Sequence, residues 1–269
     1  MSYQDRRQKN ADVFADTQRW YTGDEALGDA IRHSQRGTVL HGPEPIRVPD
    51  QALCRYEEKA RVLVSADRTL QAAGKYPGRK VLVLNFASAT TPGGGVLWGS
   101  SAQEESLCRC STLYPCLNTD TLWENYYLFH RRRQSTLYTD ACIYTPEVLS
   151  IKTDTADPRR LPREAWQKVD VLTCAAPNLR ETELDGAVLY ELHVQRGRQI
   201  LAAAAVHGAE VVILGAFGCG AFRNPPRVVA SAYRQILPAF SRAFAAVEFA
   251  VYCPPHDDTN YRVFREILE

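Results

Sequence analysis

Short runs rich in valine, isoleucine and leucine alternate along the chain with longer amphipathic segments. The runs are RVLVS (61–65), KVLVLNF (80–86), ACIYT (141–145), VDVLTC (169–174), VVILG (211–215) and VEFAVY (247–252). Most of them lack a strict alternation of apolar and polar residues, which is typical of strands covered on both faces. We therefore predict an α/β fold in which helices cover both sides of a central sheet.

Two segments in the C-terminal half have the apolar spacing of amphipathic helices. In the segment 227–244 the apolar residues recur every three or four positions and predict one buried stripe of Val229, Tyr233, Ile236, Phe240 and Phe244. Pro238 lies within this segment and is expected to kink the helix. The segment 188–208 predicts a second helix that ends at Gly208, since glycine commonly terminates helices.

The N-terminal part of the chain differs from the rest. Residues 2 to about 36 are mostly polar and charged, and a few apolar residues at helical spacing predict helices there: Val13, Phe14, Trp20 and Tyr21. The alternation of strands and helices begins after the break HGPEPIRVP (41–49), and no linker-like stretch or internal repeat divides the chain. We predict a single domain, 1–269, with a largely helical extension (1–75) and a core that carries the site (76–269).

Charge and cysteine content narrow the possible functions. The 32 lysines and arginines nearly balance the 31 acidic residues, which argues against broad electrostatic binding to nucleic acids or membranes. The N-terminus lacks the apolar run of a signal peptide, and no segment approaches eighteen unbroken apolar residues. The eight cysteines are scattered, and the close pair Cys108 and Cys110 has poor zinc spacing. We expect a reduced, cytoplasmic protein without structural disulfides or a metal site.

Two glycine-rich loops follow strand-like runs. The first contains Gly93, Gly94 and Gly95, and the second reads GAFGCGAFRNPP (215–226). Ligands of α/β sheets bind at such loops, where glycine lets backbone N–H groups approach an anion. Tight strand-to-helix turns are the alternative for either loop, but two such loops favour a bound diphosphate. Asn224 is expected to cap the following helix, which would start with proline.

Two adjacent carboxylates, Glu104 and Glu105, follow the first loop. Ser101 and Glu104 have the spacing of a capping box, which explains Glu104 as a helix-start residue. This interpretation leaves Glu105 without a role, because successive helical side chains point about 100° apart. One carboxylate would then hold a sugar hydroxyl while the other faces a scissile bond. A neighbouring like charge, a bound diphosphate and the exclusion of water would each raise a carboxyl pKa.

The spacing of these residues resembles a known signature. Gly93-Gly94-Gly95, seven residues and then Gln103-Glu104-Glu105 is similar to the motif of poly(ADP-ribose) glycohydrolases of the bacterial type. The stretches LYTDACIYTPEV (137–148), VDVLTCAAPN (169–178) and GAFGCGAFRNPP (215–226) fit the same type. The resemblance implies a three-layer α/β/α, macrodomain-like fold with a mixed sheet.

The resemblance also implies roles for residues. Glu105 would be the general acid and then the general base, Glu104 would orient the distal ribose, and Gln103 would support the pair. The first loop and the loop from Gly218 to Phe222 would hold the diphosphate, with Phe222 against the distal ribose. With Asn85 and Ser88, which end the strand before the first loop, the expected substrate-binding residues are Asn85, Ser88, Gly93, Gly94, Gly95, Val96, Gln103, Gly218, Cys219, Gly220, Ala221 and Phe222.

The activity implied is hydrolysis of ribose–ribose bonds in poly(ADP-ribose), with release of ADP-ribose from chain ends. The resemblance implies no cofactor and no metal, and a place in the DNA damage response. We expect poly(ADP-ribose) or ADP-ribosylated proteins as substrate, a monomer, and neither a membrane nor a stable nucleic-acid partner. The alternatives are removal of single ADP-ribose groups from an acceptor and a non-catalytic ADP-ribose-binding module.

A few residues leave the interpretation open. Thr91 stands before the proline where relatives of this type usually have asparagine, so the geometry around the ribose could differ. His130 and the arginines at 131–133 indicate either a solvated helix end or a surface that attracts polymer phosphates. Trp98 would either border the site or pack, and the histidines at positions 193 and 207 are expected to be structural.

Overall fold

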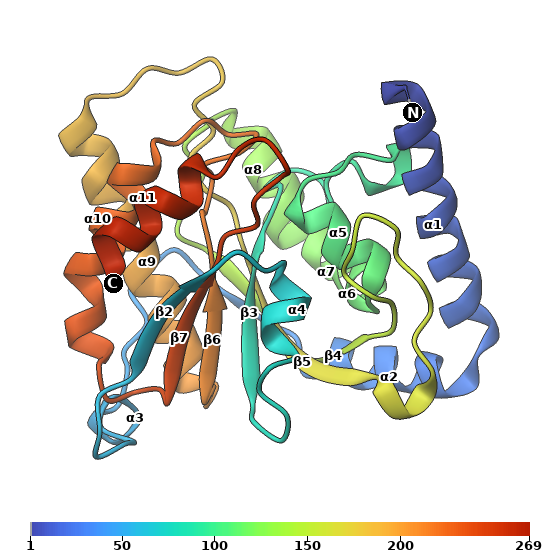
Figure 1. Ribbon diagram of the computed structural model, residues 1–269, viewed down its shortest axis with the longest axis horizontal. Helices are drawn as coiled ribbons and strands as arrows, with labels where there is room; N and C mark the ends of the chain where they lie inside the picture. The colour runs from blue at the N-terminus through green and yellow to red at the C-terminus, as the bar shows by residue number, and fades with distance from the viewer. Residues whose placement is uncertain (1) are drawn as a thin grey trace.

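Seven strands form one sheet in the computed structural model, which describes residues 2–269 (Figure 1). Their order across the sheet is β1-β4-β5-β3-β6-β7-β2. The bounds are β1 Val39–His41, β2 Arg61–Ser65, β3 Val81–Phe86, β4 Cys142–Ser150, β5 Gln167–Cys174, β6 Val211–Leu214 and β7 Ala246–Ala250. Strands β5, β3, β6, β7 and β2 are parallel, whereas β4 runs antiparallel to β5 and to β1. The predicted mixed α/β sheet is confirmed, and the strand missed in the sequence is β1.

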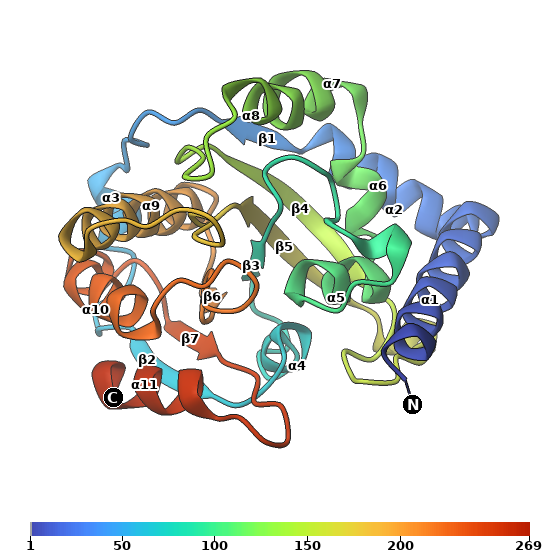
Figure 2. The same cartoon turned by 90° about the horizontal axis from the view of Figure 1, so that it is seen from above.

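Helices cover both faces of the sheet, as predicted (Figures 1 and 2). One face packs against α9 (Gly186–Val206), α10 (Pro226–Ile236) and α11 (Thr259–Leu268). The other face packs against a second group: α1 (Tyr3–Gly23), α4 (Thr69–Ala73), α5 (Gln103–Cys110), α6 (Leu113–Leu117), α7 (Asp120–Leu122) and η2 (Trp123–Tyr127), after which α8 (Leu128–Arg133) follows directly. The remaining elements are α2 (Glu25–Arg36), α3 (Asp50–Leu53), η1 (Val96–Trp98), η3 (Arg163–Ala165) and η4 (Leu237–Phe240).

The two helices predicted in the C-terminal half are present, but they end at other residues than predicted. The apolar stripe of the segment 227–244 is buried along its whole length. Pro238 does more than kink this helix: α10 ends at Ile236 and a 3₁₀ turn, η4, follows, because proline has no backbone N–H to continue the helical ladder. Helix α9 ends at Val206, and Gly208 follows in the left-handed region with a φ of 77°.

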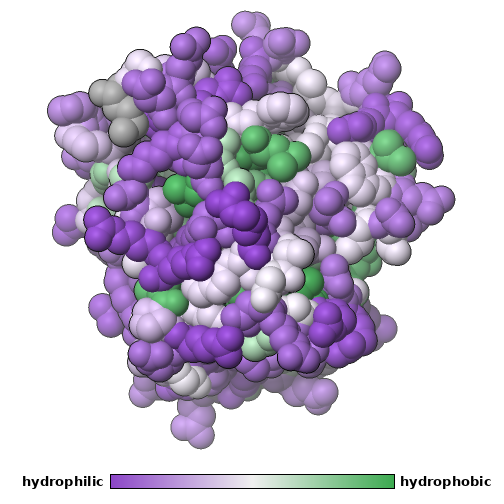
Figure 3. All heavy atoms as spheres, turned by 90° about the vertical axis from the view of Figure 1, so that its right-hand side faces the viewer, coloured by the Kyte–Doolittle hydropathy of each residue, from purple (hydrophilic) through white to green (hydrophobic). Residues whose placement is uncertain are grey.

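The predicted N-terminal helices are α1 and α2. Helix α1 buries only Asn10, Phe14 and Thr17, and the face of the molecule on its side is mostly hydrophilic (Figure 3). Phe14 packs edge-to-face against Tyr114 with the ring centres 5.0 Å apart. Within residues 2–269, no helix is both long and apolar enough to cross a membrane. All eight cysteines are free thiols.

Candidate active site

A cavity of about 760 Å³ opens at the carboxyl ends of the central strands. Both glycine loops, the start of α5 and the residues after β7 line it. Seen onto this end of the sheet, α4 and α11 lie on one side and α8 on the opposite side (Figure 2). Its lining includes Asp67 and Tyr252 near α4 and α11, and Tyr138 and Arg180 toward α8. Parallel strands whose loops converge in this way form the usual ligand site of α/β sheets.

The first residue of α5 anchors the helix to the end of β3. Gln103 accepts a hydrogen bond at Oε1 from Phe86 N (2.8 Å) and donates from Nε2 to Leu84 O (2.8 Å). The predicted capping box at Ser101 is wrong, because Ala102 is the N-cap and makes no side-chain capping bond. Glu104 turns instead toward the loop after β3, where it accepts a hydrogen bond from a backbone N–H.

Glu104 is almost fully buried, with 2% of its surface exposed. Its Oε2 accepts a hydrogen bond from Ser88 N (2.7 Å), and its Oε1 lies 3.4 Å from Asn85 Nδ2. Burial, and then the charge of Glu105, raise the pKa of Glu104 to about 8. The Oδ1 atom of Asn85 has no hydrogen-bond partner within residues 2–269. A protonated Glu104 could donate to it once the amide is turned over, since amide orientation is assigned from such networks.

The two carboxylate oxygens of Glu105 differ in their hydrogen bonding. Its Oε1 accepts a hydrogen bond from Gly95 N (2.9 Å). Its Oε2 is buried and has no partner in the part of the chain that the structure describes, although the residue lines the cavity. A buried carboxylate oxygen without a donor costs free energy unless a ligand or solvent group meets it. The arrangement therefore offers one oxygen of Glu105 for proton transfer to a bound molecule.

Two of the three glycines in the first loop contact the carboxylates: Gly94 lies against both, and Gly95 contacts Glu105. Gly93 and Gly94 have φ values of 69° and 56°, a region that favours glycine. A Cβ atom on Gly94 would lie 2.6 Å from Glu105 Oε1 and 3.0 Å from Glu104 Oε2. Only a glycine lets the backbone come this close to the acids. The sequence motif thus reflects direct contact between the loop and the carboxylate pair.

Hydrogen bonds from a buried asparagine fix the second loop to the segment after β5. Asn224 Nδ2 donates to Pro177 O (2.7 Å) and Gly218 O (3.0 Å), and its Oδ1 accepts from His193 Nε2 (2.8 Å). Asn224 is therefore not the predicted helix cap, and α10 has Pro225 as its N-cap. Burial lowers the pKa of His193 to about 4, so this histidine is neutral and structural, as predicted. The predicted Gly218–Phe222 segment reaches the cavity.

Most of the predicted site residues come together. The cavity is lined by Ser88, Gly94, Gly95, Gln103, Glu104, Glu105, Gly218, Gly220, Ala221 and Phe222. Asn85, Gly93, Val96 and Cys219 are not among the lining residues. Val96 is fully buried, and Asn85 reaches the site through its contact with Glu104.

Helix α1 supports the turn between the first loop and α5. Asn10 is buried and donates from Nδ2 to Gly99 O (3.0 Å), and Arg7 donates from Nε to Trp98 O (3.0 Å). A Cβ on Gly99 would collide with the backbone of Arg7. The side chain of Trp98 is 73% exposed and does not line the cavity, so neither role predicted for it is confirmed.

The α4 and α11 end of the cavity contains residues that the sequence alone did not single out. Tyr252 follows β7, is 44% exposed, and has the guanidinium of Arg68 3.9 Å from its ring centre. Asp67 forms an ion pair with Lys75. Only the fold brings these residues, from the ends of β2 and β7, to one wall. Their sequence signal is their position at or just beyond the ends of the predicted strands 247–252 and 61–65.

At the end of the cavity near α8, the surroundings of His130 show that its predicted interpretation is wrong. This residue is buried, with its ring nitrogens 2.8 Å from Tyr126 O and 2.9 Å from Thr139 Oγ1, so it is neither a solvated residue nor a phosphate contact. Arg131 is exposed and donates to Thr91 Oγ1 (3.3 Å). The Thr91 hydroxyl thus bonds to the end of α8.

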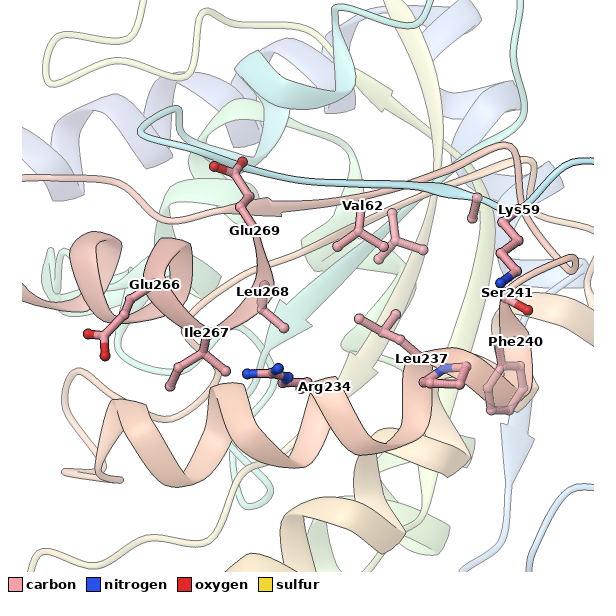
Figure 4. A pocket seen from close by; sticks show the side chains of 13 residues that line it. Lys59, Val62, Arg234, Leu237, Phe240, Ser241, Glu266, Ile267, Leu268 and Glu269 are labelled. Carbon is pink, nitrogen blue, oxygen red and sulfur yellow. The ribbon is translucent and has the colours of Figure 1, made fainter.

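A second hollow, of about 510 Å³, lies between α10, the end of α11 and β2 (Figure 4). Leu237 and Ile267 are among the apolar side chains that line it. Its carboxylates already have partners, since Glu269 accepts from Val64 N (2.8 Å) and Glu266 pairs with Arg227 (2.8 Å). Within the described residues, no side chain that lines this hollow has a buried polar atom without a partner, unlike Glu105.

Replacement of Glu104 by glutamine is expected to stabilise the fold as pH rises. The pKa of Glu104 rises from an ordinary 4.5 to about 8, so the folded state holds a proton that the unfolded chain releases, and wild-type stability falls as pH rises from 4.5 to 8. Glutamine removes this loss, and the free energy of unfolding of Glu104→Gln relative to wild type should increase by about 1.4 kcal/mol per pH unit in that range. Urea titrations at pH 5 and pH 8 measure it. Parallel stability profiles for the two proteins would contradict the burial argument.

The comparisons with known proteins agree with this geometry. A family model described as the catalytic domain of microbial-type PARG matches residues 14–153. The poly(ADP-ribose) glycohydrolase (PARG) from Thermomonospora curvata has a similar crystal structure, with a TM-score of 0.86 and 31% identity over 97% of this chain and 100% of that one. Its structure with the inhibitor ADP-HPD gives a TM-score of 0.83 and 32% identity over 97% and 99%.

A structure of the Deinococcus radiodurans enzyme in complex with ADP-ribose is also similar. It gives a TM-score of 0.76 and 33% identity over 88% of this chain and 95% of that one. No curated protein sequence matches the chain. Because the family model covers more than half of the chain and the fold agrees over nearly all of it, the chain belongs to the microbial-type poly(ADP-ribose) glycohydrolases, glycosidases that hydrolyse poly(ADP-ribose).

Proposed function

We propose that Glu105 is the general acid and then the general base in the release of ADP-ribose from poly(ADP-ribose). The observation that carries this proposal is the unpaired, buried Oε2 of Glu105 on the cavity wall, while its Oε1 is fixed by Gly95 N. Cleavage of a ribosyl bond passes through an oxocarbenium-like state, which requires protonation of the leaving oxygen. Glu105 donates that proton and then accepts one from the attacking water.

Glu104 and Glu105 cannot flank the bond as the two carboxyls of ordinary glycosidases do, because they are neighbours on one helix. One residue must therefore serve as acid and base in turn. Glu104 keeps its proton up to about pH 8 through burial, so it adds no negative charge beside Glu105 near neutral pH. Glu104 then orients the ribose hydroxyls beside the reacting carbon.

The cavity suggests how one ADP-ribose unit binds. Backbone N–H groups of the first loop and of Gly218–Phe222 hold the diphosphate. The adenine stacks at Tyr252, where Asp67 can accept a hydrogen bond from its amino group. The distal ribose then lies toward Phe222, with its anomeric carbon at Glu105. The complexes of relatives with ADP-ribose and ADP-HPD support this class of ligand.

We also propose cleavage from chain ends. Asn260, at the start of α11, lines the cavity with Tyr252, so the C-terminal segment bounds the adenine end. A further unit attached to the adenosine would meet this segment. The single domain with a helical extension (1–75) and a macrodomain-like core (76–269), the monomeric state, the cytoplasmic location and the link to DNA damage remain part of the same proposal.

Incubation with poly(ADP-ribose) and with a mono-ADP-ribosylated protein tests the proposal. We expect free ADP-ribose from the polymer, no oligomers from internal cleavage at early times, and a last unit left on the acceptor. Chromatography of the products at early times measures all three. Equal rates on the mono-modified protein would favour the acceptor hydrolase, and tight ADP-ribose binding without turnover would favour a binding module.

A further inference from the structure

The bound polymer has a direction in the cavity, which rests on the proposed function. An ADP-ribose unit with its adenine at Tyr252 places its reacting ribose toward the opposite end, near Tyr138 and Phe222. The rest of the polymer is attached to that ribose through the bond to be cleaved. The polymer must therefore leave at the end bounded by α8 and by the segment after β5. Its next charged group is the diphosphate of the adjoining ADP-ribose unit.

One arginine at this exit contacts the first loop. Arg131, in the last turn of α8, donates from Nε to Thr90 O (2.8 Å), and its guanidinium lies 4.9 Å from the ring centre of Trp123. Thr90 and Thr91 line the cavity, so the guanidinium is fixed beside its rim. The aromatic ring and the carbonyl orient the side chain before any ligand binds.

A second arginine contacts the second glycine loop in the same way, through one backbone carbonyl and one aromatic ring. Arg180 donates from Nε to Ala221 O (2.7 Å), and its guanidinium lies 5.9 Å from the ring centre of Phe222. Arg180 lines the cavity itself. Its Nη atoms make no hydrogen bond to any of residues 2–269.

These arginines are positive charges without acidic partners. Both are exposed, and neither forms a salt bridge within residues 2–269. Arg132 and Arg133 follow in the same turn and are exposed as well. The whole chain carries a net charge of only +1, so the three consecutive arginines at the end of α8 are a local concentration of positive charge. We propose that Arg131 and Arg180 bind the diphosphate of the ADP-ribose unit adjoining the one that is released.

The test compares two substrates that differ only beyond the cleaved bond. Poly(ADP-ribose) contains the adjoining diphosphate, whereas ADP-ribose with a nitrophenyl group on its anomeric carbon lacks it. In the double variant Arg131→Gln/Arg180→Gln, the ratio of kcat/KM on polymer to kcat/KM on the nitrophenyl substrate should fall about tenfold. The salt dependence of kcat/KM on polymer should weaken by a slope of about 1 for each arginine. Arg234→Gln, an exposed arginine of α10 beside the second hollow, is the matched control and should change neither value.

The outcomes separate this inference from the proposed function. A loss of loop structure would lower kcat/KM on both substrates alike and leave their ratio and the salt slope unchanged, which would overturn the inference. A wild-type protein that releases nothing from either substrate would refute the proposed function instead. A reduced ratio with a reduced salt slope supports binding of the adjoining diphosphate.

Discussion

Replacement of Glu105 by glutamine is expected to lower kcat on poly(ADP-ribose) by at least 10²–10⁴-fold, the usual contribution of a positioned acid–base group. Glutamine keeps the size of the side chain and an oxygen for the hydrogen bond from Gly95 N. It removes the proton that the leaving oxygen needs and the basic oxygen that activates water. Single-turnover release of ADP-ribose measures the loss, and calorimetry should show that ADP-ribose binding is retained.

The control for this variant is Glu266→Gln. Glu266 lies by the second hollow, is paired with Arg227 at the surface, and has no contact with the catalytic cavity. It should keep wild-type turnover. Near-normal kcat in Glu105→Gln would refute the assignment of the acid, whereas loss of both turnover and ADP-ribose binding would indicate a positioning role.

Most of the sheet was predictable because its parallel strands are nearly continuous apolar runs, as is typical of strands covered on both faces. Strand β1 and the second half of strand β4 were not predicted, because their local sequence lacks a clear strand pattern. Strand β1 is only three residues long and pairs with one neighbour, so its pattern is too short to recognise. Strand β4 continues past Thr145 to Ser150 through an irregularity at Pro146 and Glu147, where Glu147 has a φ of 51°. A proline beside a charged residue has the pattern of a strand end, and only pairing with β5 reveals the continuation.

The two wrong predictions of helix caps share one cause, which is competition from groups distant in the sequence. Ser101 and Asn224 both have the local pattern of a helix cap. In the fold, Glu104 of the expected capping box bonds to Ser88 N, and the amide of Asn224 bonds to Pro177 O and Gly218 O. These contacts join the loops of three strands. A helix cap is predicted from neighbouring residues alone. In a buried site, the same side chain can instead form hydrogen bonds to residues that are distant in the sequence.

The cavity wall that we propose for the adenine could not be predicted for a related reason. Tyr252 is one of 13 tyrosines, and its position at the end of a predicted strand is too weak a signal to single it out. Its place on this wall depends on β2 and β7 being neighbours, which places Arg68 on its ring and Asp67 on the same wall. The motif of three glycines and Gln103-Glu104-Glu105 was recognisable because all its parts lie within thirteen residues. The wall that contains Asp67 and Tyr252 joins residues that are nearly two hundred positions apart.

Replacement of Gly94 by alanine should abolish most activity although both glutamates remain in place. The new Cβ would lie 2.6 Å from Glu105 Oε1 and 3.0 Å from Glu104 Oε2, so either the loop or the acids must move. A displacement of about 1 Å at a reacting group costs roughly 10²-fold, and we expect kcat/KM on polymer to fall by at least that factor. The loop N–H groups shift with it, so ADP-ribose affinity measured by calorimetry should fall as well.

Gly78→Ala separates the clash from backbone strain. Gly78 has a φ of 75°, comparable to the 56° of Gly94, but a Cβ there would meet nothing within 4 Å, and the residue lies outside the cavity lining. Both alanines bear a similar backbone cost of about 1–2 kcal/mol, visible in urea unfolding. Only Gly94→Ala should lose turnover, because only its Cβ occupies space between the loop and the acids. Wild-type kcat/KM in Gly94→Ala would mean that the close contact of this loop with the carboxylates has no part in catalysis.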